Sequence, residues 1–262
     1  MMKLVRFGSR PPQPRLSLHR AIASRLGPLI VQGKLPSGSV LPNETSLSME
    51  FGVSRTALRE AIKVLASKGL VEVRRKTGTR VNTNAHWNML DPEVLNWMFS
   101  GDGLPTGLDD LMEVRMLVEP AAARMAAERA RAEDLKEIRE AFLGMESATG
   151  DLPSSVESDL RFHMAILEAT HNAFMRPFGA LIQAALRGSF RLTSSNTELY
   201  RSTLPLHRKV LNAIEVKNAT LAKAAMEAVL TQTTRDIVDQ TKAIRARRLN
   251  HRKPIKRGTG GR

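Results

Sequence analysis

The chain has 262 residues, no cysteine, 4% aromatic residues and a formal net charge of +14. The lack of cysteine excludes disulfides and thiolate metal sites, so nitrogen and oxygen ligands must hold any metal. The length suits two domains and the composition favours helices, while no apolar run suits a signal peptide or membrane span, so we expect a cytoplasmic protein without a membrane partner.

Residues 1–85 carry 15 Lys/Arg against 4 Asp/Glu, and this local excess of positive charge indicates contact with a polyanion. Residues 1–16 form a Pro-rich basic arm. Apolar residues then recur at helical spacing up to Gly33, and Asn43 is a suitable N-cap for a short second helix. A turn at 52–53 separates that helix from the next one, which Ser54 caps.

The helix expected from Ser54 to about Lys68 has an apolar face and a basic face, and the basic face carries Arg55, Arg59 and Lys63 at i, i+4 and i+8. After it, apolar and polar residues alternate on both sides of a turn at Gly78, which predicts a hairpin. Helix, short helix, tight turn, second helix and hairpin together predict a winged helix-turn-helix over residues 17–82.

The arrangement of this domain predicts that it has a DNA-binding surface. The helix that begins at Ser54 fits the major groove. Arg55 and Arg59 are placed for guanine edges, and Ser54 and Thr56 for phosphate oxygens. The hairpin carries further residues for the adjacent backbone or minor groove: Arg74, Arg75, Lys76 and Gly78. A solvated cationic face is the alternative for a lone basic stripe, but the turn, stripe and basic hairpin together favour DNA.

The segment GKLPSGSVLPNETSLSMEFGVSRTALREAIKVLASKGLVEVRRKTGTRV resembles the DNA-binding domain of the GntR family of bacterial transcription regulators. The resemblance rests on G-x-L-x-x-G-x-x-L-P-x-E, on S-R-T-x-x-R-E-A and on the wing glycine. It implies double-stranded operator DNA as a partner. Thr45 and Lys76 depart from the family's usual arginine and glycine, so its base preference and wing contacts do not transfer.

The second half of the chain has a different character. After a polar linker at 83–90, residues 91–240 show apolar positions three and four apart between short connections, which predicts an all-α helical bundle. Residues 86–241 carry 16 Lys/Arg against 22 Asp/Glu, so this part has another task. The fold class is therefore mainly α. Residues 241–262 are basic and poor in apolar residues, and we expect a disordered, solvated extension, with nonspecific DNA affinity as the alternative.

The segments WNMLDPEVLNWM and EVRMLVEP resemble galactonate-operon repressors of the FadR-type branch of GntR regulators. Three patterns resemble the ligand-sensing (FCD) domain of that branch. They are E-V-R-x-x-x-E-x-x-A-A-x-x-A-A at 113–127, D-x-x-F-H at 159–163 and the isolated His207. The resemblance implies that Asp159, His163 and His207 hold a divalent metal ion, with zinc expected. Val229 stands where a fourth histidine is usual.

The resemblance also implies roles in effector binding. It makes Arg115 the cation that meets an effector carboxylate and Asn172 a family asparagine. The helical period places Gln232, Thr233 and Asp236 on the face of Val229, so we expect these side chains to line the pocket. Spacing alone allows other interpretations: an Asp159–His163 hydrogen-bonded pair, an Arg115–Glu119 ion pair, and a helix-end role for Asn172.

We therefore expect a homodimeric, ligand-responsive transcription regulator, a repressor released by a sugar acid such as galactonate or by another small hydroxy-carboxylate. One alternative is a metal-dependent enzyme acting on a small acid, but the chain shows no candidate nucleophile, phosphate loop or carboxylate pair, so we expect no enzyme. The other is a ligand-independent architectural DNA-binding protein, which leaves the acidic helical domain without a role.

Overall fold

The structure is a computed structural model that describes residues 18–100, 107–148, 151–193 and 197–251. The basic arm expected at 1–16 therefore lies outside the described residues. The chain divides into two compact units, Met1–Met98 and Phe99–Arg262. Within the described residues, no helix combines the length and the apolar character that crossing a membrane requires.

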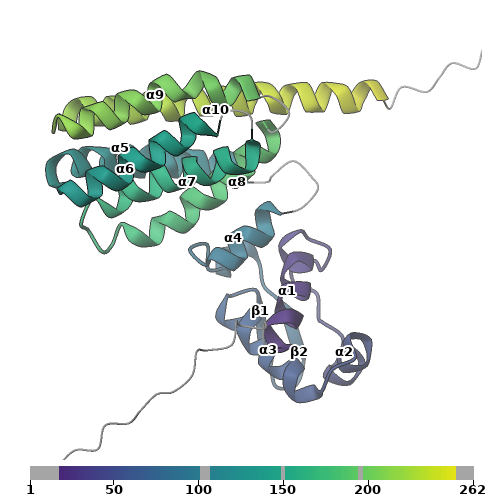
Figure 1. Ribbon diagram of the computed structural model, residues 1–262. Helices are drawn as coiled ribbons and strands as arrows, with labels where there is room; N and C mark the ends of the chain where they lie inside the picture. Colours follow the sequence, from purple (N-terminus) through teal and green to yellow (C-terminus); the bar gives the residue numbers. More distant parts are fainter. Residues whose placement is uncertain (1–17, 101–106, 149–150, 194–196, 252–262) are drawn as a thin grey trace, which may run out of the picture. The chain divides into compact units, whose positions relative to one another are not determined.

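The first unit is a winged helix-turn-helix (Figure 1). Its elements are α1 (Leu18–Val31), α2 (Glu44–Phe51), α3 (Arg55–Ser67), β1 (Val71–Arg74), β2 (Gly78–Val81), the 3-10 turn η1 (Asn84–His86) and α4 (Pro92–Phe99).

Local chemistry explains the helix-turn-helix. The Asn43 side chain accepts the backbone N–H of Ser46 at 2.9 Å, and the Ser54 side chain accepts that of Ala57 at 3.2 Å, so both helices begin at capped positions. Between them Gly52 has φ +64°, the left-handed conformation that glycine adopts without a Cβ clash. The apolar face of α3, including Leu58 and Leu65, is buried in the core.

The wing is an antiparallel hairpin in which Val71 pairs with Val81 and Arg74 with Gly78. Val40 forms an isolated bridge to Arg80, so a third extended segment lies against β2. Both Val71 and Val81 are buried, and this burial attaches the base of the wing to the helical core.

Helix α4 belongs mostly to the first unit, which differs from the expected boundary at 83–90. Val94 and Trp97 are part of the winged-helix core, and the Lys68 ammonium pairs with Asp91 at 2.7 Å and with Glu93 at 2.6 Å. The polar composition of 83–90 suggested a linker, but the apolar side of α4 and these ion pairs hold residues up to 98 in the first unit.

The second unit is all-helical: α5 (Leu108–Arg129), α6 (Ala132–Ser147), α7 (Leu152–Glu168), the 3-10 turn η2 (Arg176–Phe178), α8 (Gly179–Thr193), α9 (Thr197–Glu215) and α10 (Ala219–His251). Helix α10 packs against α5 and α9, and α6 packs against α7. Phe142 and Phe162 meet edge to face in the interior, with ring centroids 6.1 Å apart. These contacts form the predicted helical bundle.

The C-terminal segment differs from the prediction of a disordered tail over 241–262. Helix α10 continues to His251, so residues 241–251 are helical, while 252–262 lie outside the described residues. A composition poor in apolar residues argues against a core but not against a helix, because alanine, arginine and lysine are good helix formers.

Candidate functional site

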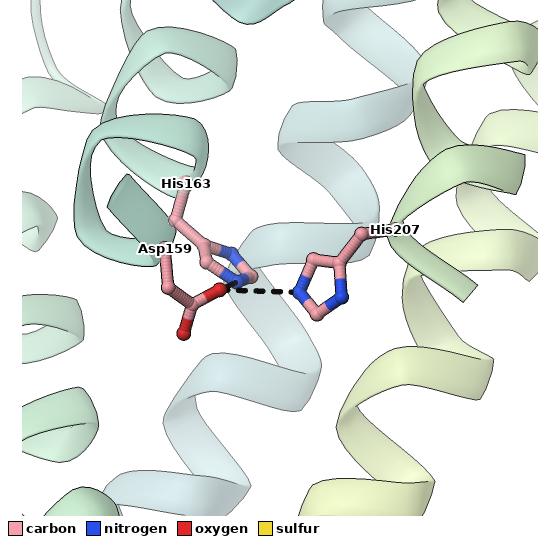
Figure 2. A group of neighbouring side chains, drawn as sticks. All are labelled: Asp159, His163 and His207. Atoms are coloured by element: carbon pink, nitrogen blue, oxygen red, sulfur yellow. Dashed lines mark ion pairs between the residues drawn. The ribbon is translucent and has the colours of Figure 1, made fainter. Parts of the chain in front are cut away.

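Two helices of the second unit bring three potential metal ligands together. Helix α7 carries Asp159 and His163 one turn apart, and α9 carries His207 (Figure 2). Among the described residues these three are the one group of its kind, with one ligand atom from each lying within 4.8 Å of the others. The Asp159 Oδ1 atom is 3.5 Å from His163 Nε2 and 3.3 Å from His207 Nε2.

The surroundings orient both imidazoles. His207 Nδ1 donates to the backbone carbonyl of Thr203 at 2.9 Å, so its Nε2 atom keeps a lone pair when the ring is neutral. His163 Nδ1 contacts Glu119 Oε2, which leaves His163 Nε2 facing Asp159. The Phe162 ring lies edge-on to both imidazoles, with centroids 5.8 and 5.4 Å away.

These residues fit a divalent metal. Asp159 Oδ1 and His207 Nε2 are buried and have no hydrogen-bond partner among the described residues, which is unusual for polar atoms in an interior. Ligands at about 2.0–2.1 Å around a tetrahedral ion lie about 3.3 Å from one another, and the two oxygen–nitrogen distances are close to this value.

Electrostatics stabilise the charged forms of the cluster when no metal is bound. Burial opposes ionisation of Asp159, but His163 and His207 hold the pKa of that carboxyl well below its usual range. Burial likewise opposes a charged His163, yet Glu119 and Asp159 raise the pKa of this imidazole to about 9. A metal must therefore displace a proton from His163 at neutral pH.

A cavity of about 60 Å³ lies beside the cluster and is lined in part by Arg115, Asp159, His163, His207 and Val229. Its other walls are apolar and hydroxyl-bearing, with one further carboxylate: Leu186, Ser189, Phe190, Leu199, Tyr200, Thr203, Thr233 and Asp236. Burial raises the pKa of that carboxylate, Asp236. The cavity thus combines potential metal ligands with a cation and several polar groups.

Of the expected effector contacts Arg115, Asn172 and Gln232, Arg115 lines the cavity and the other two do not. Arg115 reaches the cavity, but its Nε donates to Glu119 Oε1 at 2.5 Å, so the ion pair allowed by spacing is formed. Asn172 does not line the cavity, because its side chain accepts the backbone N–H of Phe174 in the turn after α7. Gln232 does not line it either; its side-chain amide donates to Asp236 at 2.9 Å.

Glu119 is the residue whose position sequence reasoning missed. The residue is 2% exposed, and its carboxylate contacts both Arg115 and His163. The E-V-R-x-x-x-E pattern placed it one turn from Arg115, but contact with His163 joins two helices that the pattern treats separately. The signal in the sequence is the helical face that Glu119 shares with Ala122, Ala123 and Ala126, because these small apolar residues predict burial of that face.

The residues expected to face DNA lie on α3 and the hairpin. Ser54 caps α3, and Arg55 and Thr56 are exposed in its first turn. Arg59 is exposed too, but its Nε donates to Glu44 of α2 at 2.8 Å.

On the hairpin, Arg74 pairs with Glu72 at 2.9 Å, while Arg75 and Lys76 are exposed in the turn. Gly78 has φ +83°, and a Cβ there would lie 3.3 Å from Val40, so a side chain at this position would be strained. The recognition helix and the wing therefore present cations from the same unit.

Comparison with known proteins decides the family. The model of the bacterial regulatory proteins of the gntR family matches residues 18–81, and the FCD domain model matches residues 110–253. The chain belongs to the GntR family. This confirms the predicted winged helix-turn-helix followed by a helical ligand-sensing domain of the FadR-type branch.

Individual relatives agree with this assignment. The chain is 36% identical to the galactonate operon transcriptional repressor of Escherichia coli over 84% of its own length and 96% of the relative's. It is 32% identical to the Uxu operon transcriptional regulator of the same species, over 79% of this chain and 82% of that relative. The solved structure of Lar, which controls the Listeria monocytogenes agr system, matches with a TM-score of 0.61 at 20% identity, covering 87% of this chain and 99% of that one, and shows the same fold.

The GntR-family protein is a ligand-responsive DNA-binding transcription regulator. Its winged helix binds operator DNA and its FCD domain binds a small-molecule effector. The family and the relatives are regulators, which confirms the expectation that the protein is not an enzyme.

Proposed function

We propose that this GntR regulator represses transcription until a sugar acid or another small hydroxy-carboxylate binds in the cavity beside a divalent metal ion, zinc being the expected one. The proposal rests on one observation above all: two imidazole nitrogens and a carboxylate oxygen converge at the wall of a cavity. The likeness to a galactonate operon repressor supports both the repressor role and the class of effector.

Three residues would hold the metal. Asp159, His163 and His207 supply three ligands, and Val229, which lines the cavity where a fourth histidine is usual in the family, cannot supply another. A divalent ion held by three protein ligands supplies an open Lewis-acid position that a carboxylate or an adjacent hydroxyl can occupy.

The remaining cavity residues would recognise the effector. Arg115 supplies the cation for a carboxylate, since this residue lines the cavity while its Nε donates to Glu119. Ser189 and Thr233 offer hydroxyls for the polar remainder of the effector. A preference of the effector for one arrangement of the helices would then change DNA affinity, because a ligand shifts an equilibrium only through such a preference.

On the DNA side, we propose that a homodimer binds a pseudopalindrome through two copies of the winged helix, because one copy reads too few base pairs for useful specificity. Arg55 and Arg59 would read base edges, with Ser54 and Thr56 on phosphates. The wing would add backbone or minor-groove contacts through Arg74, Arg75 and Lys76, with Gly78 allowing the tight turn.

The proposal is tested with purified protein in three steps. Elemental analysis should find about one divalent ion per chain, a thermal-shift screen of sugar acids and short hydroxy acids should find a stabilising ligand, and that ligand should release operator DNA. Full effector affinity after exhaustive chelation would reduce Asp159, His163 and His207 to a polar cluster, and would leave Arg115 as the sole anchor.

A further inference from the structure

We infer that Glu119 is the positioning residue of the metal centre, and that it links the metal ligand His163 to the effector anchor Arg115. This inference rests on the proposed metal-dependent function and adds a residue whose role neither the motifs nor the relatives assign. Glu119 does not itself belong to the group of three converging ligands.

The geometry of its two oxygens carries the inference. Glu119 Oε2 contacts His163 Nδ1, while Oε1 accepts from Arg115 Nε at 2.5 Å. Each oxygen of this one carboxylate therefore has a different partner, one belonging to the metal centre and the other to the effector anchor. With Nδ1 turned toward Glu119, the ring of His163 can offer only Nε2 to a metal.

Burial favours this arrangement. Arg115, Glu119 and His163 are 1%, 2% and 3% exposed, so bulk water has little access to these contacts. Buried charges remain charged only when they are paired. A carboxylate that accepts the outer N–H of a metal-bound histidine fixes the orientation of the ring and raises the basicity of the ligating nitrogen.

The same helix offers a matched comparison. Arg124 and Glu128 repeat the Arg–Glu pair at i, i+4 on α5, with an Nη1–Oε1 distance of 2.9 Å. Their side chains are 50% and 40% exposed. The two pairs therefore share their helix, spacing and chemistry, but only the Arg115–Glu119 pair is buried and contacts a histidine of the cluster.

The test measures Zn²⁺ affinity alone, by competition with a chromophoric chelator, in protein first stripped of metal. Glu119→Met should weaken Zn²⁺ binding about 10- to 100-fold, the range typical of lost partners of metal ligands. Glu119→Gln should fall between wild type and Glu119→Met, because its amide oxygen still accepts from His163. Glu128→Met, the matched control, should stay within about twofold of wild type.

A double variant separates two explanations for weaker Zn²⁺ binding: loss of the positioning of His163, and loss of the negative charge that neutralises Arg115. Arg115→Met with Glu119→Met removes both buried charges, so it also remains informative if Glu119→Met alone fails to fold. Positioning predicts that the double variant keeps the 10- to 100-fold loss. Recovery of wild-type Zn²⁺ affinity in the double variant overturns the inference. Wild-type Zn²⁺ affinity in folded Glu119→Met and Glu119→Gln overturns it as well.

A spectroscopic readout reports on His163 directly. The visible bands of the Co²⁺-loaded protein should change in Glu119→Met and remain as in wild type in Glu128→Met, because only the first substitution alters the ligand field. Identical spectra in all three proteins overturn the inference. A wild-type protein that binds neither Zn²⁺ nor Co²⁺ instead rejects the metal-dependent proposed function itself.

Discussion

Replacing Trp97 with alanine should destabilise the DNA-binding unit and leave the sensing unit unaffected. Trp97 is 6% exposed and packs on the winged-helix core. Its ring lies against Gly27, where an added Cβ would be 2.3 Å from a ring carbon. The Lys68 ammonium lies 5.7 Å from the ring centroid.

The expected loss is large for a unit of this size. Truncating a buried tryptophan to alanine costs about 3–5 kcal/mol, and this range includes the cavity left beside Gly27. Loss of the cation–π contact with Lys68 adds about 0.5–1 kcal/mol. With an m-value of about 2 kcal/mol/M in urea, a loss of about 4 kcal/mol moves the unfolding midpoint down by about 2 M.

The chain provides its own optical probe for this experiment. Its two tryptophans, Trp87 and Trp97, both lie in the first unit. In Trp97→Ala, the fluorescence of Trp87 therefore reports on the DNA-binding unit alone, while circular dichroism at 222 nm is dominated by the long helices of the second unit. Phe174→Ala is the control, since that side chain is 85% exposed and lies in the second unit.

Only one combination of shifts in the two unfolding transitions agrees with the assignment of α4 to the first unit. The Trp87 transition should move to lower urea in Trp97→Ala, and the main dichroism transition should not. If the Trp87 transition stays where it is in wild type while the dichroism transition shifts, then Trp97 stabilises the sensing unit and the expected boundary before residue 91 is restored.

Three other outcomes are expected. Below about pH 9, Zn²⁺ affinity should rise about tenfold per pH unit, because the metal must displace one proton from His163. Burial opposes a charged His163, but Glu119 and Asp159 raise the pKa of this imidazole. A flat competition titration between pH 6 and 8 would contradict this. Arg55→Ala should cost about 1–3 kcal/mol of operator binding and relax specificity, whereas Lys76→Ala should mainly reduce the salt dependence of binding in gel-shift assays; unchanged operator preference in Arg55→Ala would argue against base reading by α3. Glu44→Gln should change the unfolding free energy by less than about 1 kcal/mol, since its ion pair with Arg59 is exposed; a urea midpoint lowered by more than 1 M would show that the pair is structural.

Sequence patterns predicted the elements that depend on local chemistry. Asn43 and Ser54 were identified as caps because their preference for helix starts is local, and the alternation around Gly78 predicted the hairpin. The boundary of the first unit was not predictable in the same way, because it depends on Trp97 packing against Gly27, seventy positions away. The helical extension of α10 was missed because disorder was judged from a lack of apolar residues.

The site shows the same division between local and long-range information. The i, i+4 spacing of Asp159 and His163 placed both on one face of a helix, but only the family resemblance connected them with His207 on another helix. The helical period placed Gln232 near Val229 without showing that Asp236 would receive its amide. Contact of Glu119 with His163 joins α5 to α7, which no single-helix pattern can reveal.

Gly27 and the Trp97 ring constrain each other in the first unit. Glycine inside a helix costs about 1 kcal/mol relative to alanine, yet Gly27 is buried inside α1. The methyl group of alanine would overlap the Trp97 ring, with its nearest ring carbon 2.3 Å away. The two positions are therefore expected to covary among descendants of this chain. A side chain larger than hydrogen at 27 becomes acceptable only after the aromatic ring at 97 has been replaced by something smaller, so an aromatic residue at 97 predicts glycine at 27.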